Sequence, residues 1–265
     1  MLTKFRRPLG LCLLVAVVSS CSSETQRSKF PEVSDVQEVD LRWQPKTGTR
    51  VVLRMTVSVR LSGTVVQSEP ESKRVQNVAA LRTIEFPDVG PGYFEVRVSQ
   101  NGVNVPATMR FSNEFSLLDI KYDTDVAGAP DMEKVKAAVN PLLAKLQETR
   151  SVYGKWKVGE TRPIEFQFPS PVGPGVAIKG TTRLRRIVLV GGRAACEFQF
   201  EGTGDMKMQS GPIRMIMKGL EFRDIGTGLP IGQSGTGHAD VSVQGKSLRV
   251  EIETEEVLDA GQSRF

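Results

Sequence analysis

The sequence predicts a mainly β protein, a β-rich α+β fold. Antiparallel meanders would form a curved sheet or half-barrel with one kinked helical segment. Residues 51–61, VVLRMTVSVRL, alternate apolar and polar side chains, as a strand with one buried and one wet face does. Gln100-Asn101-Gly102 is typical of a tight hairpin turn between two such segments. Further strands are predicted at 75–86, 93–100, 103–111, 115–122, 163–168, 182–190, 194–201, 205–218, 237–244 and 247–257.

The first 20 residues have the features of a lipoprotein signal peptide. Lys4, Arg6 and Arg7 precede the apolar run 11–18, which is too short to span a bilayer. The following Val18-Ser19-Ser20-Cys21 resembles the lipobox of bacterial lipoproteins. This resemblance implies cleavage before Cys21 and acylation of its sulfur and new amino group, which together anchor a protein stably.

The residue after the lipobox adds an expectation about location. Ser22 stands where an Asp would mark inner-membrane retention in enteric-type bacteria. The resemblance therefore implies a lipid-anchored protein of the cell envelope, in the outer membrane and facing the periplasm.

Charge and cysteine content narrow the function classes. The signal peptide holds three of the 35 basic residues and none of the 30 acidic ones, so the formal charge falls from +5 to +2 after cleavage. No basic cluster follows it, and a nucleic-acid partner is not expected. Cys12 leaves with the signal and Cys21 carries lipid, so Cys196 has no disulfide partner within the mature chain.

The rest of the chain divides by composition. Residues 21–40 are predicted to be a lipidated, disordered tether, 41–127 a first β meander, 128–152 a helical segment and 153–265 a second β meander. The stretch 41–265 is short enough to form one domain. Apolar residues recur at helical spacing between Asp131 and Arg150, and Pro141 kinks this helix. Similar openings at Trp43 and Trp156 raise the hypothesis of two related halves.

The body resembles uncharacterised β-rich envelope lipoproteins in which a Trp–Lys–Gly opening precedes β meanders around a helical segment. It is also similar to the half-barrel-plus-helix envelope carriers that shelter acyl chains. These resemblances carry no functional residue over to this chain.

A methionine-rich stretch is the main candidate site. Ser210-Gly211-Pro212 predicts a turn that places Met206 opposite Met217 and Met208 opposite Met215, all on one face. Gly202-Thr203-Gly204 predicts another turn, which sets Phe200 beside Met206 and Phe198 beside Met208, with Cys196 on the same face. The stretch admits three hypotheses. It is a packed core, an apolar ligand or partner face made of Met206, Met208, Met215, Met217, Phe198 and Phe200, or a Cu(I) site made of the four methionines.

The remaining motifs give no catalytic set. His238 is the single histidine and is expected at the surface or in a turn. The glycine-rich run 226–237 is expected to be a flexible loop. Glu251, Glu253 and Glu255 predict the wet face of a terminal strand, where charge discourages edge pairing.

The sequence therefore favours a non-enzymatic envelope binding or assembly protein without a cofactor. Its expected partners are the membrane, through the N-terminal lipid, and a hydrophobic ligand or an envelope protein. A carrier of a lipid-like hydrophobic ligand and a Cu(I)-binding protein are the alternatives. The carrier hypothesis predicts an apolar cavity of a few hundred cubic ångströms.

Overall fold

The computed structural model describes residues 30–33, 35–100, 103–104, 107–113, 117–122, 152–170, 173–208, 211–243 and 246–265. A single short helix of the described chain, α2 (Glu71–Arg74), follows β2. The predicted helical segment 128–152 lies outside the described residues apart from Val152. The strands are β1 (Glu38–Leu41), β2 (Arg50–Ser62), β3 (Val75–Glu85), β4 (Val89–Gly90), β5 (Tyr93–Gln100), β6 (Val103–Asn104), β7 (Ala107–Ser112), β8 (Leu117–Tyr122), β9 (Gly154–Lys157), β10 (Thr161–Ser170), β11 (Gly173–Val190), β12 (Arg193–Met208), β13 (Gly211–Asp224), β14 (Pro230–Val243) and β15 (Lys246–Leu258).

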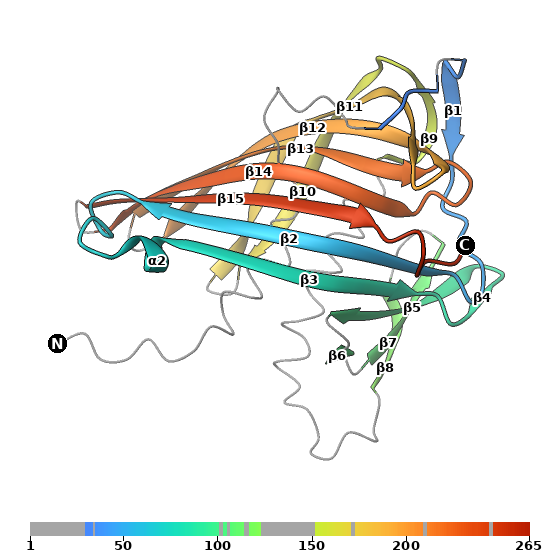
Figure 1. The fold of residues 1–265 in the computed structure, drawn as a ribbon, viewed down its shortest axis with the longest axis horizontal. Helices are drawn as coiled ribbons and strands as arrows, with labels where there is room; N and C mark the ends of the chain where they lie inside the picture. The colour runs from blue at the N-terminus through green and yellow to red at the C-terminus, as the bar shows by residue number, and fades with distance from the viewer. Residues whose placement is uncertain are drawn as a thin grey trace.

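One large antiparallel sheet dominates the molecule. It has 13 strands in the order β10-β11-β12-β13-β14-β15-β2-β3-β5-β7-β8, and β4 and β6 pair with β5. The sheet is visibly curved, and the small sheet of β1 and β9 lies near one of its ends (Figure 1). The predicted mainly β class with a curved antiparallel sheet is confirmed. In the described part of the chain, no helix is both long and apolar enough to span a bilayer.

The two predicted meanders belong to the same sheet. Strand β15 pairs with β2 from Arg249↔Ser62 to Leu258↔Leu53, which joins the second meander to the first. The wet face predicted for β15 is confirmed, because Glu253 and Glu255 are exposed. The prediction that β15 is an edge is wrong, since it lies between β14 and β2. A local pattern reveals which face is wet but not which distant strand pairs beside it.

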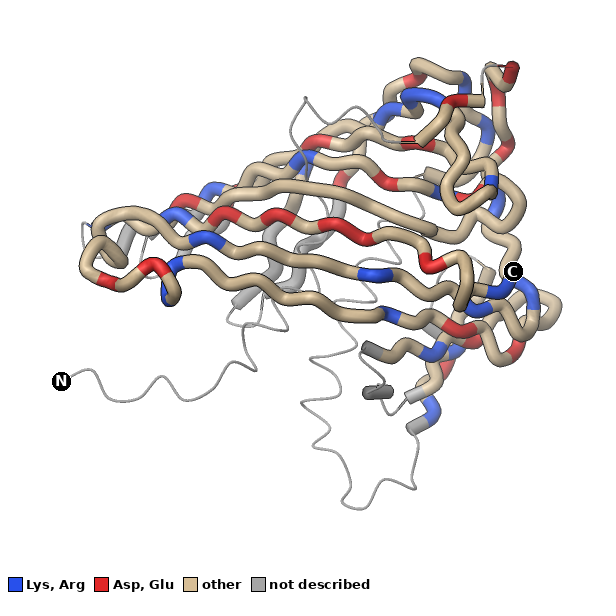
Figure 2. Tube along the Cα trace, viewed as in Figure 1, with Lys and Arg blue, Asp and Glu red and all other residues tan. Residues whose placement is uncertain are grey.

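The large sheet has an inner, buried face and an outer, polar face. On β2, Met55 and Val57 are buried while the alternating residues Arg54 and Thr56 are exposed, as period two requires. We call the face that carries Met55 and Val57 the inner face. The inner face continues onto β15, because the strand register places Thr254 opposite Val57. Glu253 and Glu255 of β15 alternate with the buried residues and lie on the outer face, on a strand whose acidic positions are coloured in Figure 2.

Buried apolar side chains form three clusters. The first includes Leu53, Phe86, Phe94, Phe111 and Phe222. The second draws on β10, β11, β12, β13, β15, β2 and β3, and its members are Met55, Val57, Val59, Ala80, Ile164, Ile178, Phe200, Met217 and Ile252. The third joins β1 and β9 to the large sheet through Leu41, Trp156, Leu184, Cys196 and Phe198, among others. Side chains from strands far apart in the sheet thus share one core, which fits the curvature in Figure 1.

The glycine-rich run 226–237 is not a flexible loop throughout, as predicted, because β14 begins at Pro230. The connection between β13 and β14 is residues 225–229, of which 225–227 form a turn. Glycine lowers strand propensity in general, but it is selected where side chains or backbones approach closely. On the inner face this approach is tight: a Cβ at Gly219 would lie 2.5 Å from Cζ of Phe200. Gly219 therefore makes room for the Phe200 ring, and within the run a Cβ at Gly232 would lie 3.1 Å from the carbonyl oxygen of Glu256.

Gly180 offers the sharpest test of this close approach. A Cβ there would lie 1.9 Å from the carbonyl oxygen of Glu201 on β12, so Gly180→Ala must displace backbone. We expect it to lower the free energy of unfolding by about 3 kcal/mol. Urea titration followed by circular dichroism measures the change. Gly226→Ala is the matched control, because its nearest neighbouring atom would be 3.5 Å away. Equal stability of the two variants would contradict the packing argument.

The chain joins the body earlier than predicted. The tether was expected to reach residue 40, yet the Phe30 ring packs edge-on against Phe222 at 5.1 Å. The backbone N–H of Val33 donates to the carbonyl of Ile187 at 2.9 Å, and that of Leu189 donates to Pro31 at 2.9 Å. Composition alone missed this because backbone hydrogen bonds hold the polar stretch.

Candidate functional site

The methionine stretch lies on β12 and β13, with a register that differs from the predicted one. Met215 is opposite Gly204 and Met217 is opposite Gly202, while Met206 is opposite Ile213. The predicted methionine pairs are therefore wrong. The strands pair as far as Met208↔Gly211, so the connection is shorter than the predicted turn. The shift moves the register by an even number of residues, so positions 206, 208, 215 and 217 keep the same phase of alternation along the two strands.

The two phenylalanines reach that face by another route. Strand β12 runs unbroken from Arg193 to Met208, so the predicted turn at 202–204 does not exist. Phe198 and Phe200 precede Met206 on the same strand and not on a neighbouring one. They share its face by alternation, with Gly202 and Gly204 between them.

The described members of this set pack in two different clusters. Phe200 and Met217 are buried in the second cluster, and Met215 packs against it partly exposed. Phe198 is buried in the third cluster, 5.1 Å from Trp156 in an edge-on contact. The side chains of Met206 and Met208 lie outside the described part. The structure thus brings Phe200 and Met217 together in one cluster and places Phe198 in another. The hypotheses of an apolar ligand face and of a Cu(I) site stay predictions.

Cys196 is on the same face and deeply enclosed. It is a free, buried thiol in the third cluster. Burial raises its pKa from 9.0 to about 12. Between these pH values an unfolded chain loses a proton that the folded protein keeps, so stability falls as pH rises through this range.

We therefore expect Cys196 to resist alkylation in the folded protein. At pH 8 iodoacetamide should modify it about a thousandfold more slowly than in urea, because the thiolate is the nucleophile. The ratio of the two rates is measured by mass spectrometry of a chain that begins after Cys21. Samples are taken over time with and without urea. Comparable rates in the two conditions would show that the thiol is accessible.

A row of polar side chains crosses the otherwise apolar inner face. The register places Gln233 opposite Glu256 and Glu256 opposite Met55. Arg82 of β3 completes the row: its Nη1 lies 2.5 Å from Oε1 of Glu256, with side-chain exposures of 11% and 2%. Its Nη2 also donates to Sδ of Met55 at 3.4 Å. The buried carboxylate is thus neutralised by a nearly buried guanidinium.

Two further groups extend this polar row. Arg223 is 1% exposed and its Nη2 lies 2.6 Å from Oε1 of Glu221, the residue opposite Gln233. Thr254 precedes Glu256 by two residues on β15 and therefore lies on the same face. Its side chain is 2% exposed, and its Oγ1 has no hydrogen-bond partner in the described structure. Sequence reasoning missed this row. The adjacent pair Glu255-Glu256 was the available signal, because alternation must turn one of two neighbouring carboxylates inward.

The described surface also has an open depression of about 570 Å³ at the end of the sheet where β2 meets β3. It is lined by Ser62, Gly63, Arg214, Asp240, Val241, Ser247, Leu248 and Arg249. Asp240 lies 3.8 Å from both His238 Nε2 and Arg249 Nη1. His238 is a strand residue beside Glu251 and not part of a turn. The lining is mixed and open, unlike the enclosed apolar cavity that a carrier needs.

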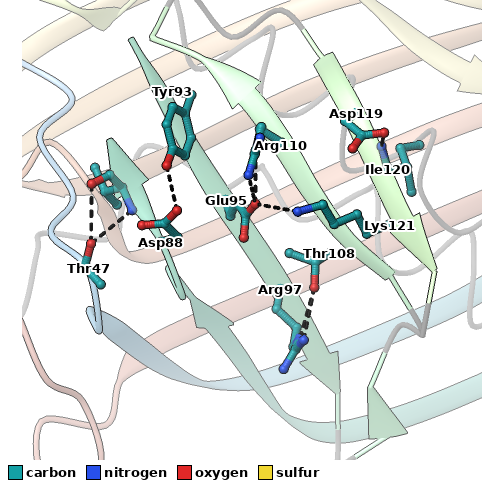
Figure 3. A network of polar contacts seen from close by, with 11 residues as sticks. Thr47, Asp88, Tyr93, Glu95, Arg97, Thr108, Arg110, Asp119, Ile120 and Lys121 are labelled. Carbon is teal, nitrogen blue, oxygen red and sulfur yellow. Dashed lines mark hydrogen bonds and ion pairs between the residues drawn. The ribbon is translucent and has the colours of Figure 1, made fainter. Parts of the chain in front are cut away.

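A second polar network fastens β5, β7 and β8 together (Figure 3). Glu95 is largely buried and accepts hydrogen bonds from Nε and Nη2 of Arg110 at 3.0 and 2.6 Å, and Lys121 lies 3.5 Å away. Tyr93 donates to Asp88 at 2.7 Å, and this hydrogen bond raises the pKa of Tyr93. Arg110 of β7 and Lys121 of β8 both pair with Glu95 of β5, so these contacts tie three strands together.

The geometry contains no recognisable catalytic constellation in the described ranges. Within those same residues, no group of three or more His, Cys, Asp or Glu side chains is arranged to hold a metal ion. The inner face is thus an apolar surface with a neutralised polar row, and its chemistry is that of packing and hydrogen bonding.

Comparison with protein-family models and with curated proteins finds no match. Among solved structures, the chain is similar to the hypothetical lipoprotein YmcC from Escherichia coli K12, at 10% identity over 76% of this chain and 85% of that one, with a TM-score of 0.27. It is also similar to Ail, the attachment invasion locus protein of Yersinia pestis, at 5% identity over 80% and 99% of the two chains, with a TM-score of 0.17. At these scores neither likeness carries an argument about function.

Proposed function

We propose that this chain is a lipid-anchored envelope protein, tethered through Cys21, that acts by binding and not by catalysis. The proposal is supported by the way the curved sheet uses its inner face. Met55, Val57 and Ile178 are at most 2% exposed there, and the cluster is built from the chain's own strands. A filled interior leaves the ends of the sheet and its outer face for contact with partners. The outer-membrane location implied by Ser22 is part of the same proposal.

A hydrophobic-ligand carrier is the second candidate. Thr254 Oγ1 favours it, because an unbonded hydroxyl on a buried apolar face can receive the polar group of an amphiphile. The row formed by Gln233, Glu256 and Arg82 offers further hydrogen bonds beside it. The filling of the described interior argues for the first candidate.

Anchoring is tested by metabolic labelling with an alkyne fatty acid in a bacterial host. We expect the wild-type chain to incorporate the label and Cys21→Ala to lose it, since the thioether carries the first acyl chains. Cys196→Ala is the matched control and should retain full labelling. Sucrose-gradient separation of the membranes then tests the outer-membrane location. Label on the Cys21→Ala protein, or none on the wild type, would refute the anchor.

Binding is tested by native mass spectrometry of residues 22–265, exported without the lipid cysteine and purified without detergent or chelator. A mass without adducts supports a protein that binds its partners through its exposed surface. An adduct of several hundred daltons would favour the carrier. A copper adduct under reducing conditions, lost in Met206→Leu/Met208→Leu, would favour the Cu(I) hypothesis.

A further inference from the structure

We propose that one end of the large sheet rests on an anionic lipid surface, with the opposite end directed away from the membrane. We call it the anchor end and define it by the turn Gly191-Gly192, the turn 225–227 and residues 259–265. A Cβ on Gly191 would lie 3.2 Å from Cβ of Ala260, and the Arg193 guanidinium lies 3.8 Å from the Phe265 ring centroid. These segments are therefore neighbours. The inference rests on the proposed lipidation of Cys21.

The chain meets the body at this end. Phe30 packs on Phe222, two residues from the end of β13, and Pro31 bonds to Leu189, just before the turn at Gly191. Arg186 adds an ion pair of 3.2 Å to Glu32. The path from the lipid therefore enters the structure beside the anchor end.

Chain length limits how far this end can stand from the membrane. Only residues 22–29 separate Cys21 from Phe30, and at about 3.3–3.6 Å per residue they span at most about 30 Å. Strand β2 has 13 residues at about 3.3 Å each, so the opposite end of the sheet lies about 40 Å from the anchor end. That end holds the depression lined by Arg214 and Arg249.

The charges at and near the anchor end suit phosphate groups. In two ion pairs the carboxylate is buried and the guanidinium is more exposed: Arg193–Asp224 at 32% and 3%, and Arg54–Asp259 at 72% and 6%. Positive charge therefore faces outward and is attracted to anionic headgroups.

The outer face of the sheet disfavours the flat orientation. Glu253 and Glu255 are exposed on β15, which lies in the middle of the strand order and carries a row of acidic positions in Figure 2. Lying flat would bring these carboxylates against lipid phosphates, and like charges repel. The end-on orientation avoids this contact.

The test uses the acylated full-length protein in phosphatidylglycerol-containing vesicles with nitroxide-labelled headgroups. A fluorophore is attached at Ala260→Cys on the anchor end or at Ser68→Cys on the opposite end; both positions are exposed, and Cys196 is buried. We expect at least about twofold stronger quenching at position 260 than at 68, given the separation of the two ends. The difference should shrink in neutral phosphatidylcholine vesicles.

Three outcomes overturn the proposal. Equal quenching at both positions would indicate a flat orientation, and stronger quenching at 68 would indicate the reverse one. Intact mass is measured first, so a chain without acyl groups would refute the anchor itself and, with it, this orientation. Acylated protein with equal quenching would refute the orientation alone.

Discussion

Replacing Arg82 by methionine is expected to lower the free energy of unfolding by about 3–5 kcal/mol, because it leaves the carboxylate of Glu256 buried without its cation. For a body of this size the melting temperature should fall by about 6–20 °C. The methionine side chain retains much of the volume, so the lost charge dominates the effect. Thermal unfolding at pH 7, followed by circular dichroism, measures it.

The control for this prediction is the double variant Arg82→Met/Glu256→Leu. Removing both charges from an apolar face is often neutral or stabilising, so most of the lost stability should return. Arg50→Met is a second control, because its partner Glu85 is 42% exposed and the pair is screened by water. If the double variant is less stable than Arg82→Met, the two charges do not act as a pair.

Trp156→Ala is expected to cost about 3–5 kcal/mol, because it removes the largest side chain of the third cluster. The indole is fully buried, packs against Phe198, and donates from Nε1 to the carbonyl of Val152 at 2.7 Å. The Arg162 guanidinium also lies 3.7 Å from its ring centroid. Urea titration gives the change in the free energy of unfolding.

Two variants separate the causes of this loss. Trp156→Phe keeps an aromatic ring but not the N–H donor, and should fall between the wild type and Trp156→Ala. Leu118→Ala, at a side chain 56% exposed, should change stability little. A Trp156→Ala protein as stable as Leu118→Ala would mean that the small β1–β9 sheet adds little to the fold.

Local patterns predicted the strands well where one face is buried. The range 51–61 nearly matches β2 because its alternation reports burial directly. The positions of Met206, Met208, Met215 and Met217 on two adjacent strands were predictable for the same reason, but their partners were not. Register depends on where the connection lies, and the partner of Met206 is Ile213 in place of the predicted Met217, four residues away.

Glycine caused the main errors. Gly202 and Gly204 were interpreted as a turn, and the run 226–237 as a loop, although these segments belong largely to β12 and β14. Single-sequence reasoning treats glycine as a strand breaker, whereas a tightly curved sheet uses it where a neighbour such as Ile178 needs the space. The pairing of Arg82 with Glu256 could not be predicted either, because their strands are separated by β2 and lie far apart in sequence.

The pairing of β2 with β15 has a consequence for how the protein is made. It joins Leu53 to Leu258, so the centre of the sheet is assembled from strands that are about 200 residues apart in the sequence. Contacts of such long sequence separation slow folding, because the intervening loop must be closed first. Because β2 precedes β15 in the sequence, its second edge stays uncovered until β15 is available to pair with it. During that interval the apolar side of β2 is exposed to aggregation, and we expect refolding yield to fall as protein concentration rises.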